Sequence, residues 1–149
     1  GEPVDIRKYE FVPMPVKEEW GVLVREDSPL ARKEYIEPAD LMGISLVTGS
    51  RDFHGELIRW FGELYDKLEI AAVGNLLYNE AMLVGNGMDA VLCIRLNCRY
   101  ENLRFIPLHP PVESRTALIW KKDAVFSRAT AAFIDLIAQY LKAISGDKI

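Results

Sequence analysis

The most informative pattern lies between Ile44 and Arg95, where short apolar runs alternate with amphipathic segments. The three apolar runs are rich in strand-forming residues and are 44–47, 68–73 and 88–94. The two segments between them carry apolar residues at helical spacing and lie within 53–64 and 74–87. Strands that alternate with helices predict βαβ units and a parallel sheet. Because such sheets bind small ligands beyond the carboxyl ends of their strands, the pattern predicts a binding lobe.

Proline-bearing extended segments flank this unit. Upstream, 9–16 contains Pro13 and Pro15, which suit an edge or connecting strand, and 20–24 is predicted as a second strand. The acidic pair Glu18 and Glu19 is predicted to lie in a solvated loop between them.

Downstream, strands are predicted at 103–108 and 116–120. Ser127 is then expected to cap a final helix, whose apolar face extends to Leu141. The outer pieces, 9–26 and 116–141, should meet each other.

These segments predict three parts. Residues 1–43 form part of a first lobe and a hinge strand, 44–102 form a second lobe, and 103–149 return to the first lobe with a last strand and helix. The outer parts together are too small to cover both faces of a sheet. We therefore expect the rest of the first lobe to precede Gly1.

Composition narrows the class of protein. The chain has 149 residues, half of them hydrophobic, and its 18 basic and 22 acidic side chains give a formal charge of −4. An acidic balance argues against nucleic-acid binding by this stretch itself. The sequence contains neither an apolar run of about 20 residues nor a secretory leader, so we expect a cytoplasmic protein without membrane contact.

Five candidate binding residues lie where predicted strands meet helices, and they are Thr48, Gly49, Ser50, Arg51 and Asn75. Backbone N–H groups and hydroxyls at such junctions can hold a small anion such as a carboxylate, with help from the helix dipole. The amide of Asn75 can both donate and accept hydrogen bonds. The structural alternative is that Ser50 and Asn75 are helix caps and Arg51 is a solvated charge. Both interpretations stay open, since one residue can cap a helix and bind a ligand.

Other chemistry has little support in the sequence. No acid, base and nucleophile cluster, phosphate loop or dinucleotide motif is present, so we expect no enzyme and no cofactor. His54 and His109 are far apart, and with Cys93 and Cys98 they match no metal-ligand spacing. We expect Cys93 in the core and the two cysteines to be reduced, although a disulfide between them is conceivable.

Three segments together resemble the effector-binding domain of LysR-type transcriptional regulators. They are Trp20 to Ala31 with Glu37 to Leu41, Asn75 to Ala90, and Ile119 to Lys122 with Phe126 and Ser127. Within the second segment, Met88 and Asp89 stand where the family has a second glycine. The resemblance implies an α/β, periplasmic-binding-protein-like (type 2) fold with two lobes, of which the second is complete here and the first partial.

The resemblance also implies a function. A small-molecule effector would bind between the lobes and be coupled allosterically to a DNA-binding domain absent from this chain. The family further implies a homodimer or higher homo-oligomer. The alternatives are a solute-binding protein of a transporter and, with less support, an enzyme on the same fold. The sequence upstream of Gly1 would distinguish the first two, because a regulator has a helix-turn-helix there and a transport protein has a leader.

Overall fold

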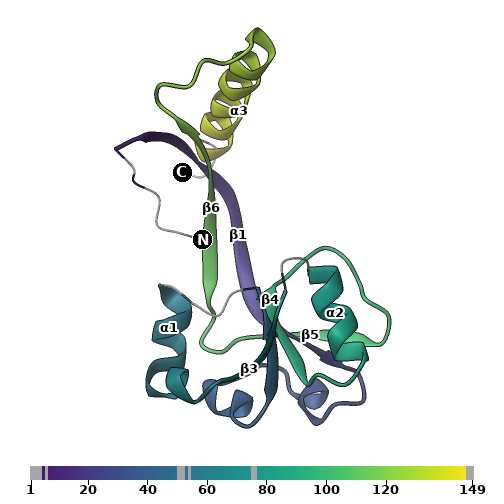
Figure 1. The fold of residues 1–149 in the computed structure, drawn as a ribbon. Helices are drawn as coiled ribbons and strands as arrows, with labels where there is room; N and C mark the ends of the chain where they lie inside the picture. The colour runs from purple at the N-terminus through teal and green to yellow at the C-terminus, as the bar shows by residue number, and fades with distance from the viewer. Residues whose placement is uncertain (1–4, 6, 50–52, 54, 75–76, 147–149) are drawn as a thin grey trace. The chain divides into compact units, whose positions relative to one another are not determined.

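The computed structural model describes residues 5, 7–49, 53, 55–74 and 77–146 (Figure 1). Its strands are β1 (Tyr9–Arg25), β2 (Ser45–Thr48), β3 (Glu69–Val73), β4 (Ala90–Ile94), β5 (Leu103–Pro107) and β6 (Glu113–Lys121). Its α-helices are α1 (Glu56–Phe61), α2 (Leu77–Gly85) and α3 (Arg128–Gly146). Short 3₁₀ helices are η1 (Pro29–Arg32), η2 (Pro38–Leu41) and η3 (Gly62–Lys67).

The chain forms two compact units. One consists of residues 18–114, and the other combines 1–17 with 115–149. The chain therefore passes from one unit to the other twice, at 17/18 and at 114/115. The finer assignment of 1–43, 44–102 and 103–149 to two lobes stays a prediction.

A mixed sheet organises the larger unit. Its strand order is β3-β2-β4-β1-β5, and β6 pairs with β1. β2 runs parallel to both β3 and β4, whereas β1 runs antiparallel to β4 and β5. The three strands predicted for the βαβαβ unit are thus neighbours in one sheet, as expected. Their predicted parallel arrangement is confirmed. The whole sheet is mixed because β1, which lies outside that unit, joins it without the helical crossover that parallel neighbours need.

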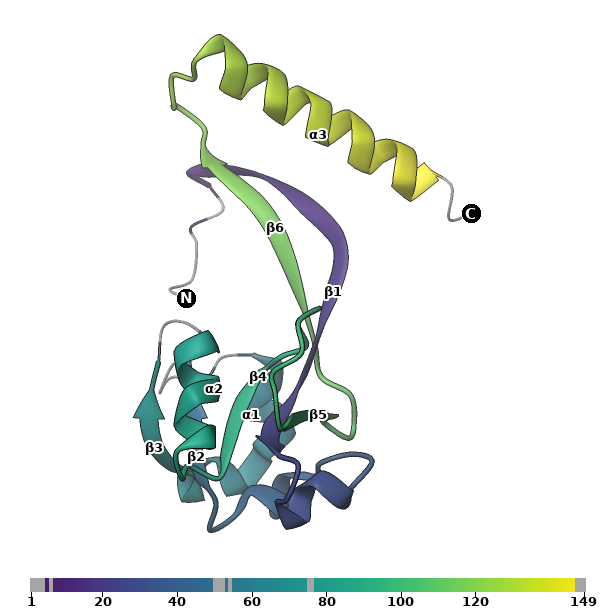
Figure 2. The ribbon, with the colours of Figure 1, turned by 90° about the vertical axis from the view of Figure 1, so that its right-hand side faces the viewer.

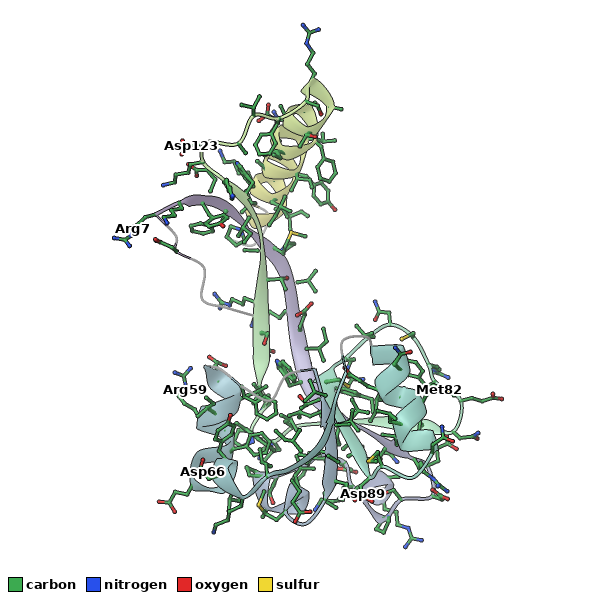
Figure 3. All side chains as sticks on the ribbon, viewed as in Figure 1. Arg7, Arg59, Asp66, Met82, Asp89 and Asp123 are labelled. Atoms are coloured by element: carbon green, nitrogen blue, oxygen red, sulfur yellow. The ribbon has the colours of Figure 1, made fainter. Side chains whose placement is uncertain are left out.

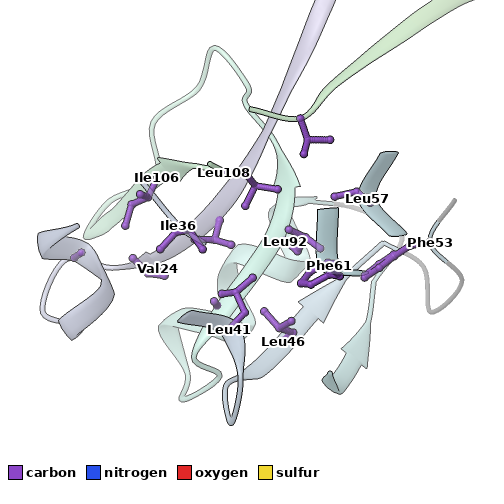
Figure 4. Packing of buried hydrophobic residues seen from close by; sticks show 14 residues of the cluster. Val24, Ile36, Leu41, Leu46, Phe53, Leu57, Phe61, Leu92, Ile106 and Leu108 are labelled. Carbon is purple, nitrogen blue, oxygen red and sulfur yellow. The ribbon is translucent and has the colours of Figure 1, made fainter. Parts of the chain in front are cut away.

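Alternating side chains of this sheet form two hydrophobic cores. On one face, Val22, Val24 and Leu92 pack with residues of α1 and the 3₁₀ helices (Figure 4). On the other face, Val91 packs with residues of α2 such as Val84. Figures 1 and 2 show α1 and α2 with the strands β2 and β4 between them. Successive side chains of a strand point to opposite faces of the sheet, and helices cover both faces here.

The smaller unit contains α3 and the outer parts of β1 and β6. The backbone N–H of Lys122 donates to the carbonyl of Lys8 at 3.0 Å, and the pairing of β6 with β1 confirms that the outer pieces meet. Ser127 caps α3 as predicted, since its Oγ accepts from the backbone N–H of Thr130 at 3.2 Å. Leu141 is buried, but Leu136 is 66% exposed, so part of the helix's apolar stripe has no cover among the described residues.

Two local predictions were wrong. β1 is one continuous strand through Pro13, Pro15 and the acidic pair, where a loop at Glu18 and Glu19 was expected. The amphipathic segment 53–64 is not one helix, because α1 ends at Phe61 and η3 follows. Gly62 has φ of +55°, a left-handed conformation that glycine adopts without strain and that interrupts the α-helix.

Candidate functional site

The parallel strands β2 and β3 end side by side, with Thr48 the last residue of β2 and Gly74 directly after β3. The backbone N–H of Gly74 donates to the carbonyl of Thr48 at 3.0 Å, which ties the two ends together. Thr48 is 2% exposed, whereas Gly49 is exposed, and a Cβ added at Gly49 would make only ordinary contacts of 3.9 Å, with Oε1 of Glu80 and the carbonyl oxygen of Gly74. This edge is where open α/β sheets bind ligands.

The candidate residues predicted from sequence are only partly described. Thr48 and Gly49 lie at this edge, as the strand pattern predicted. Ser50, Arg51 and Asn75 lie outside the described residues. Their part in binding an effector therefore stays a prediction.

A buried acid at this edge was missed by the sequence reasoning. Glu80 of α2 is only 4% exposed, and burial raises the pKa of its carboxyl group above the ordinary value. An added Cβ at Gly74 would lie 2.4 Å from its Cγ and 2.7 Å from its Oε1, so the side chain occupies the space beside that glycine. The same Oε1 lies 3.9 Å from the Cβ position of Gly49. Glu80 therefore contacts the loops that follow both parallel strands.

A sequence signal for Glu80 existed. The position falls four residues before Val84, so helical spacing places it on the same face of α2 as that apolar residue. A charged residue at such a position is unusual unless it has a partner. Met82 lies in the segment 74–87 that was predicted as an amphipathic helix, but its side chain is 52% exposed on α2 (Figure 3).

The Cys93 thiol and the Tyr100 hydroxyl, whose electrostatics Glu80 affects, both stay protonated at neutral pH. Burial, with the nearby charge of Glu80, raises the pKa of the Cys93 thiol to about 12, so it stays protonated. Burial and a hydrogen bond with Cys98 likewise raise the pKa of Tyr100 to about 12. Cys93 is buried and both cysteines are free, as expected. Because a protonated, buried thiol is a poor nucleophile, this cluster does not suggest covalent catalysis.

β1 and β6 cross the boundary between the two units at 17/18 and 114/115. Just inside the larger unit, polar contacts hold both strands in place. Trp20 donates from Nε1 to Oγ of Ser114 at 2.6 Å, which joins β1 to β6. Arg95 pairs through Nε with Glu19 at 2.6 Å and stacks over the ring of Phe105 at 4.5 Å. These contacts explain why the acidic pair lies in a strand: Glu19 has a partner on the segment that follows β4.

A hollow lies at the opposite edge of the sheet, between the end of α2 and the loop before β5. Its volume is about 670 Å³, and Arg25, Arg99, Tyr100 and Glu101 are among its lining residues. Its charges are of both signs, and Arg25 is already paired with Asp27. Because it lies away from the carboxyl ends of the parallel strands, it is a weaker candidate than the edge at Thr48 and Gly74.

Two further tests concern only the described part of the chain. Its histidines, cysteines and acids form no group of three that could hold a metal ion. None of its helices has the length and apolar character needed to span a bilayer. His109 is exposed and its ring packs against that of Tyr35 in a tilted arrangement, with ring centroids 4.7 Å apart, while His54 lies outside the described residues.

Solved structures confirm the fold. The effector-binding domain of QuiR in complex with shikimate has a TM-score of 0.74 at 22% identity, covering 93% of this chain and 68% of that one. HinK, a LysR family transcriptional regulator from Pseudomonas aeruginosa, has a TM-score of 0.70 at 20% identity, covering 95% of this chain and 51% of that one. The predicted periplasmic-binding-protein-like (type 2) α/β fold is therefore confirmed.

Sequence comparison agrees. An uncharacterised HTH-type transcriptional regulator of Escherichia coli K12, YbhD, is 30% identical over 137 residues, which are 86% of this chain and 42% of that protein. The chain thus spans less than half the length of this relative. The family model described as the LysR substrate binding domain matches residues 1–142. With nearly its whole length matched, the chain belongs to the family of LysR substrate-binding domains.

Proposed function

We propose that this chain is the effector-sensing part of a LysR-type transcription factor. A small molecule would bind at the edge formed by Thr48 and Gly74, between this lobe and a first lobe of which the chain holds only a part. The bound state would be coupled to a DNA-binding domain outside the chain. The observation that carries this proposal is the exposed Gly49 between two parallel strand ends, in a chain of this family.

The chemistry of the edge favours a small polar effector. Exposed glycine leaves the backbone accessible to a ligand, and Ser50, Arg51 and Asn75 follow in the sequence as candidate contacts for a carboxylate. The neighbouring structure that contains shikimate, a hydroxylated acid, supports this choice of ligand class.

The two chain crossings give the coupling a physical route. The chain passes between the units at 17/18 and 114/115, and two-strand connections of this kind permit hinge motion. An effector would bias the relative orientation of the lobes by its difference in affinity for the two states. We propose that this orientation is transmitted to the DNA-binding domains in a homodimer or higher homo-oligomer.

The solute-binding alternative has no comparable support, since the relatives reported above are regulators. We further propose a cytoplasmic location, which regulation of transcription requires in a bacterium. The described residues at the edge offer no acid, base and nucleophile set, because Glu80 is the acid there and the buried Cys93 thiol stays protonated.

A thermal-shift screen of the full-length protein tests the proposal. The panel should contain small organic acids, shikimate among them, and matched neutral compounds. We expect at least one acid to raise the unfolding midpoint in proportion to the logarithm of its concentration, as a ligand of the native state does. A Thr48→Val variant should weaken that effect. A screen in which no compound binds, or in which Thr48→Val leaves binding unchanged, would contradict the proposal.

A further inference from the structure

Trp20 lies on β1 just inside the larger unit, close to where the chain first crosses between the units. We infer that Trp20 is a positioning residue for the coupling. Through its hydrogen bond to Ser114 it holds both crossing strands to the sheet edge that carries the candidate site, so that binding there is passed on to the smaller unit. The inference rests on the proposed function, because it names the contact through which the same site acts.

The burial of β1 changes along its length. Residues 21–24 are buried, 18–20 are half-buried and 13–17 are exposed. Val22 and Val24 have no exposed surface and belong to the core of the larger unit. Among the described residues of β1, Trp20 is the outermost that packs against this core. The part of the strand that packing holds in place therefore ends at Trp20.

Every polar group of Trp20 bonds to the segment that leads to the second crossing. Its backbone N–H donates to the carbonyl of Val112 at 2.9 Å, and its carbonyl accepts from the N–H of Leu108 at 3.1 Å. Its indole Nε1 donates to Oγ of Ser114 at 2.6 Å. Ser114 is the last residue before the crossing at 114/115. One residue therefore joins the outgoing strand to the returning one at the boundary of the larger unit.

Trp20 also lies at the edge of the sheet where the candidate site is. β4 runs parallel to β2, so both strands end at the same edge. Trp20 is opposite Ile94, the last residue of β4. Arg95, which follows, donates from its backbone N–H to the carbonyl of Glu19 at 2.7 Å and pairs with its carboxylate at 2.6 Å. Because β4 lies between β2 and β1, only one strand separates Trp20 from the end of β2.

These contacts decide where the connection bends. A strand that is bonded along both edges and packed on a core moves with its sheet, whereas an exposed two-stranded ribbon is only marginally stable and bends easily. With the Trp20–Ser114 hydrogen bond in place, both strands follow the sheet edge and bending is confined to the residues beyond the crossings. Without it, β6 shifts against β1, and an orientation set at the sheet edge is lost before it reaches the smaller unit.

Hydrogen exchange of the full-length protein without effector tests the contact itself. Ser114→Ala removes the acceptor and leaves the indole ring unchanged. We expect the amides of Trp20 and Leu108 to exchange up to about tenfold faster in this variant, the effect of losing one hydrogen bond, while the amide of Val91 within β4 stays unchanged. Unchanged exchange at Trp20 and Leu108 would overturn the inference whether or not an effector is known.

Fluorescence anisotropy tests the coupling. The probe is a DNA duplex selected by the full-length protein from random sequences, and the coupling ratio compares its affinity with and without a saturating acid from the thermal-shift screen. We expect Ser114→Ala and Trp20→Phe each to bring this ratio at least about threefold closer to one, while the dissociation constant of the acid changes by less than about twofold. The double variant should go no further than either single one, because both remove the same bond.

Ser28→Ala is the matched control. Its hydroxyl accepts from the backbone N–H of Leu30 at 3.3 Å, away from both crossings, so losing it should leave the coupling ratio unchanged. A ratio unaffected by Ser114→Ala, or one reduced equally by Ser28→Ala, would overturn the role of Trp20 and leave the proposed function standing. A full-length protein whose DNA affinity responds to no acid would instead contradict the proposed function, and the role of Trp20 with it.

Discussion

Replacing Gly74 by alanine tests whether the space at the strand edge is filled by Glu80. The new Cβ would lie 2.4 Å from Cγ, 2.7 Å from Oε1 and 3.0 Å from Cδ of Glu80. Contacts this short force the acid out of its position, and overpacking of this kind costs about 1–3 kcal/mol. Gly74 is not in the left-handed backbone region, so the cost would be steric and not conformational. We expect Gly74→Ala to lower the free energy of unfolding, measured in urea, by that amount.

A double-mutant cycle shows whether Glu80 is the cause. With Glu80→Ala already present, the collision disappears and Gly74→Ala should be neutral or stabilising by up to about 0.5–1 kcal/mol, through the unfolded chain. Gly85→Ala is the matched control, because Gly85 lies in α2 with nothing within 4 Å of its Cβ position. The packing interpretation is refuted if Gly74→Ala costs the same with and without Glu80, or if it costs no more than Gly85→Ala.

Three further changes test other parts of the structure. Gly21→Ala should lower the free energy of unfolding by about 3 kcal/mol, because its Cβ would lie 2.3 Å from the Phe105 ring and 2.5 Å from the backbone oxygen of Ile106. An unfolding midpoint near that of the unsubstituted chain would contradict the register of β1 and β5. Glu80→Gln should raise the unfolding midpoint at pH 7 but not at pH 4. Burial raises the pKa of the Glu80 carboxyl group in the folded chain, so the acid costs stability as the pH rises through that pKa. A midpoint difference that is the same at both pH values would argue against this raised pKa. The polypeptide 1–149 should self-associate through the exposed apolar stripe of α3, as measured by sedimentation velocity. Leu136→Glu should reduce this self-association, because the Leu136 side chain is 66% exposed on that stripe. A monomeric unsubstituted chain would show that the stripe does not mediate self-association.

Local patterns predicted the order of elements well. The apolar runs that became β2, β3 and β4 were identified because each is short, β-rich and bounded by turn residues, and these features act within a few residues. The Ser127 cap was predictable for the same reason, since its hydrogen bond reaches only to Thr130. The fold class followed from the alternation of strands and helices.

The features that failed depend on distant parts of the chain. β1 continues through Glu18 and Glu19 because Arg95, far along the sequence, pairs with Glu19 and its backbone N–H bonds to the Glu19 carbonyl. The mixed sheet depends on where β1 inserts, which no local pattern reports. The helix at 53–64 was predicted too long because the conformation of Gly62 outweighs the apolar periodicity.

The candidate site was predicted in outline only. The position of Thr48 and Gly49 at the end of β2 was predicted because strand ends are visible in the sequence, while their part in binding stays a prediction. Glu80 was overlooked because its burial beside Gly74 exists only once α2 packs across the strand ends. An acid on the apolar stripe of a predicted helix is therefore a signal worth testing in other sequences of this kind.

The most direct test is amide NMR of the full-length protein during titration with an acid from the thermal-shift screen. If the effector binds at the carboxyl ends of β2 and β3, saturable shift changes will concentrate at Thr48, Gly49, Gly74 and Glu80. The amides of Ser45 and Glu69, where β2 and β3 begin, will stay unchanged. Shift changes concentrated at the beginnings of the strands, or around the hollow lined by Arg25 and Arg99, would contradict the site.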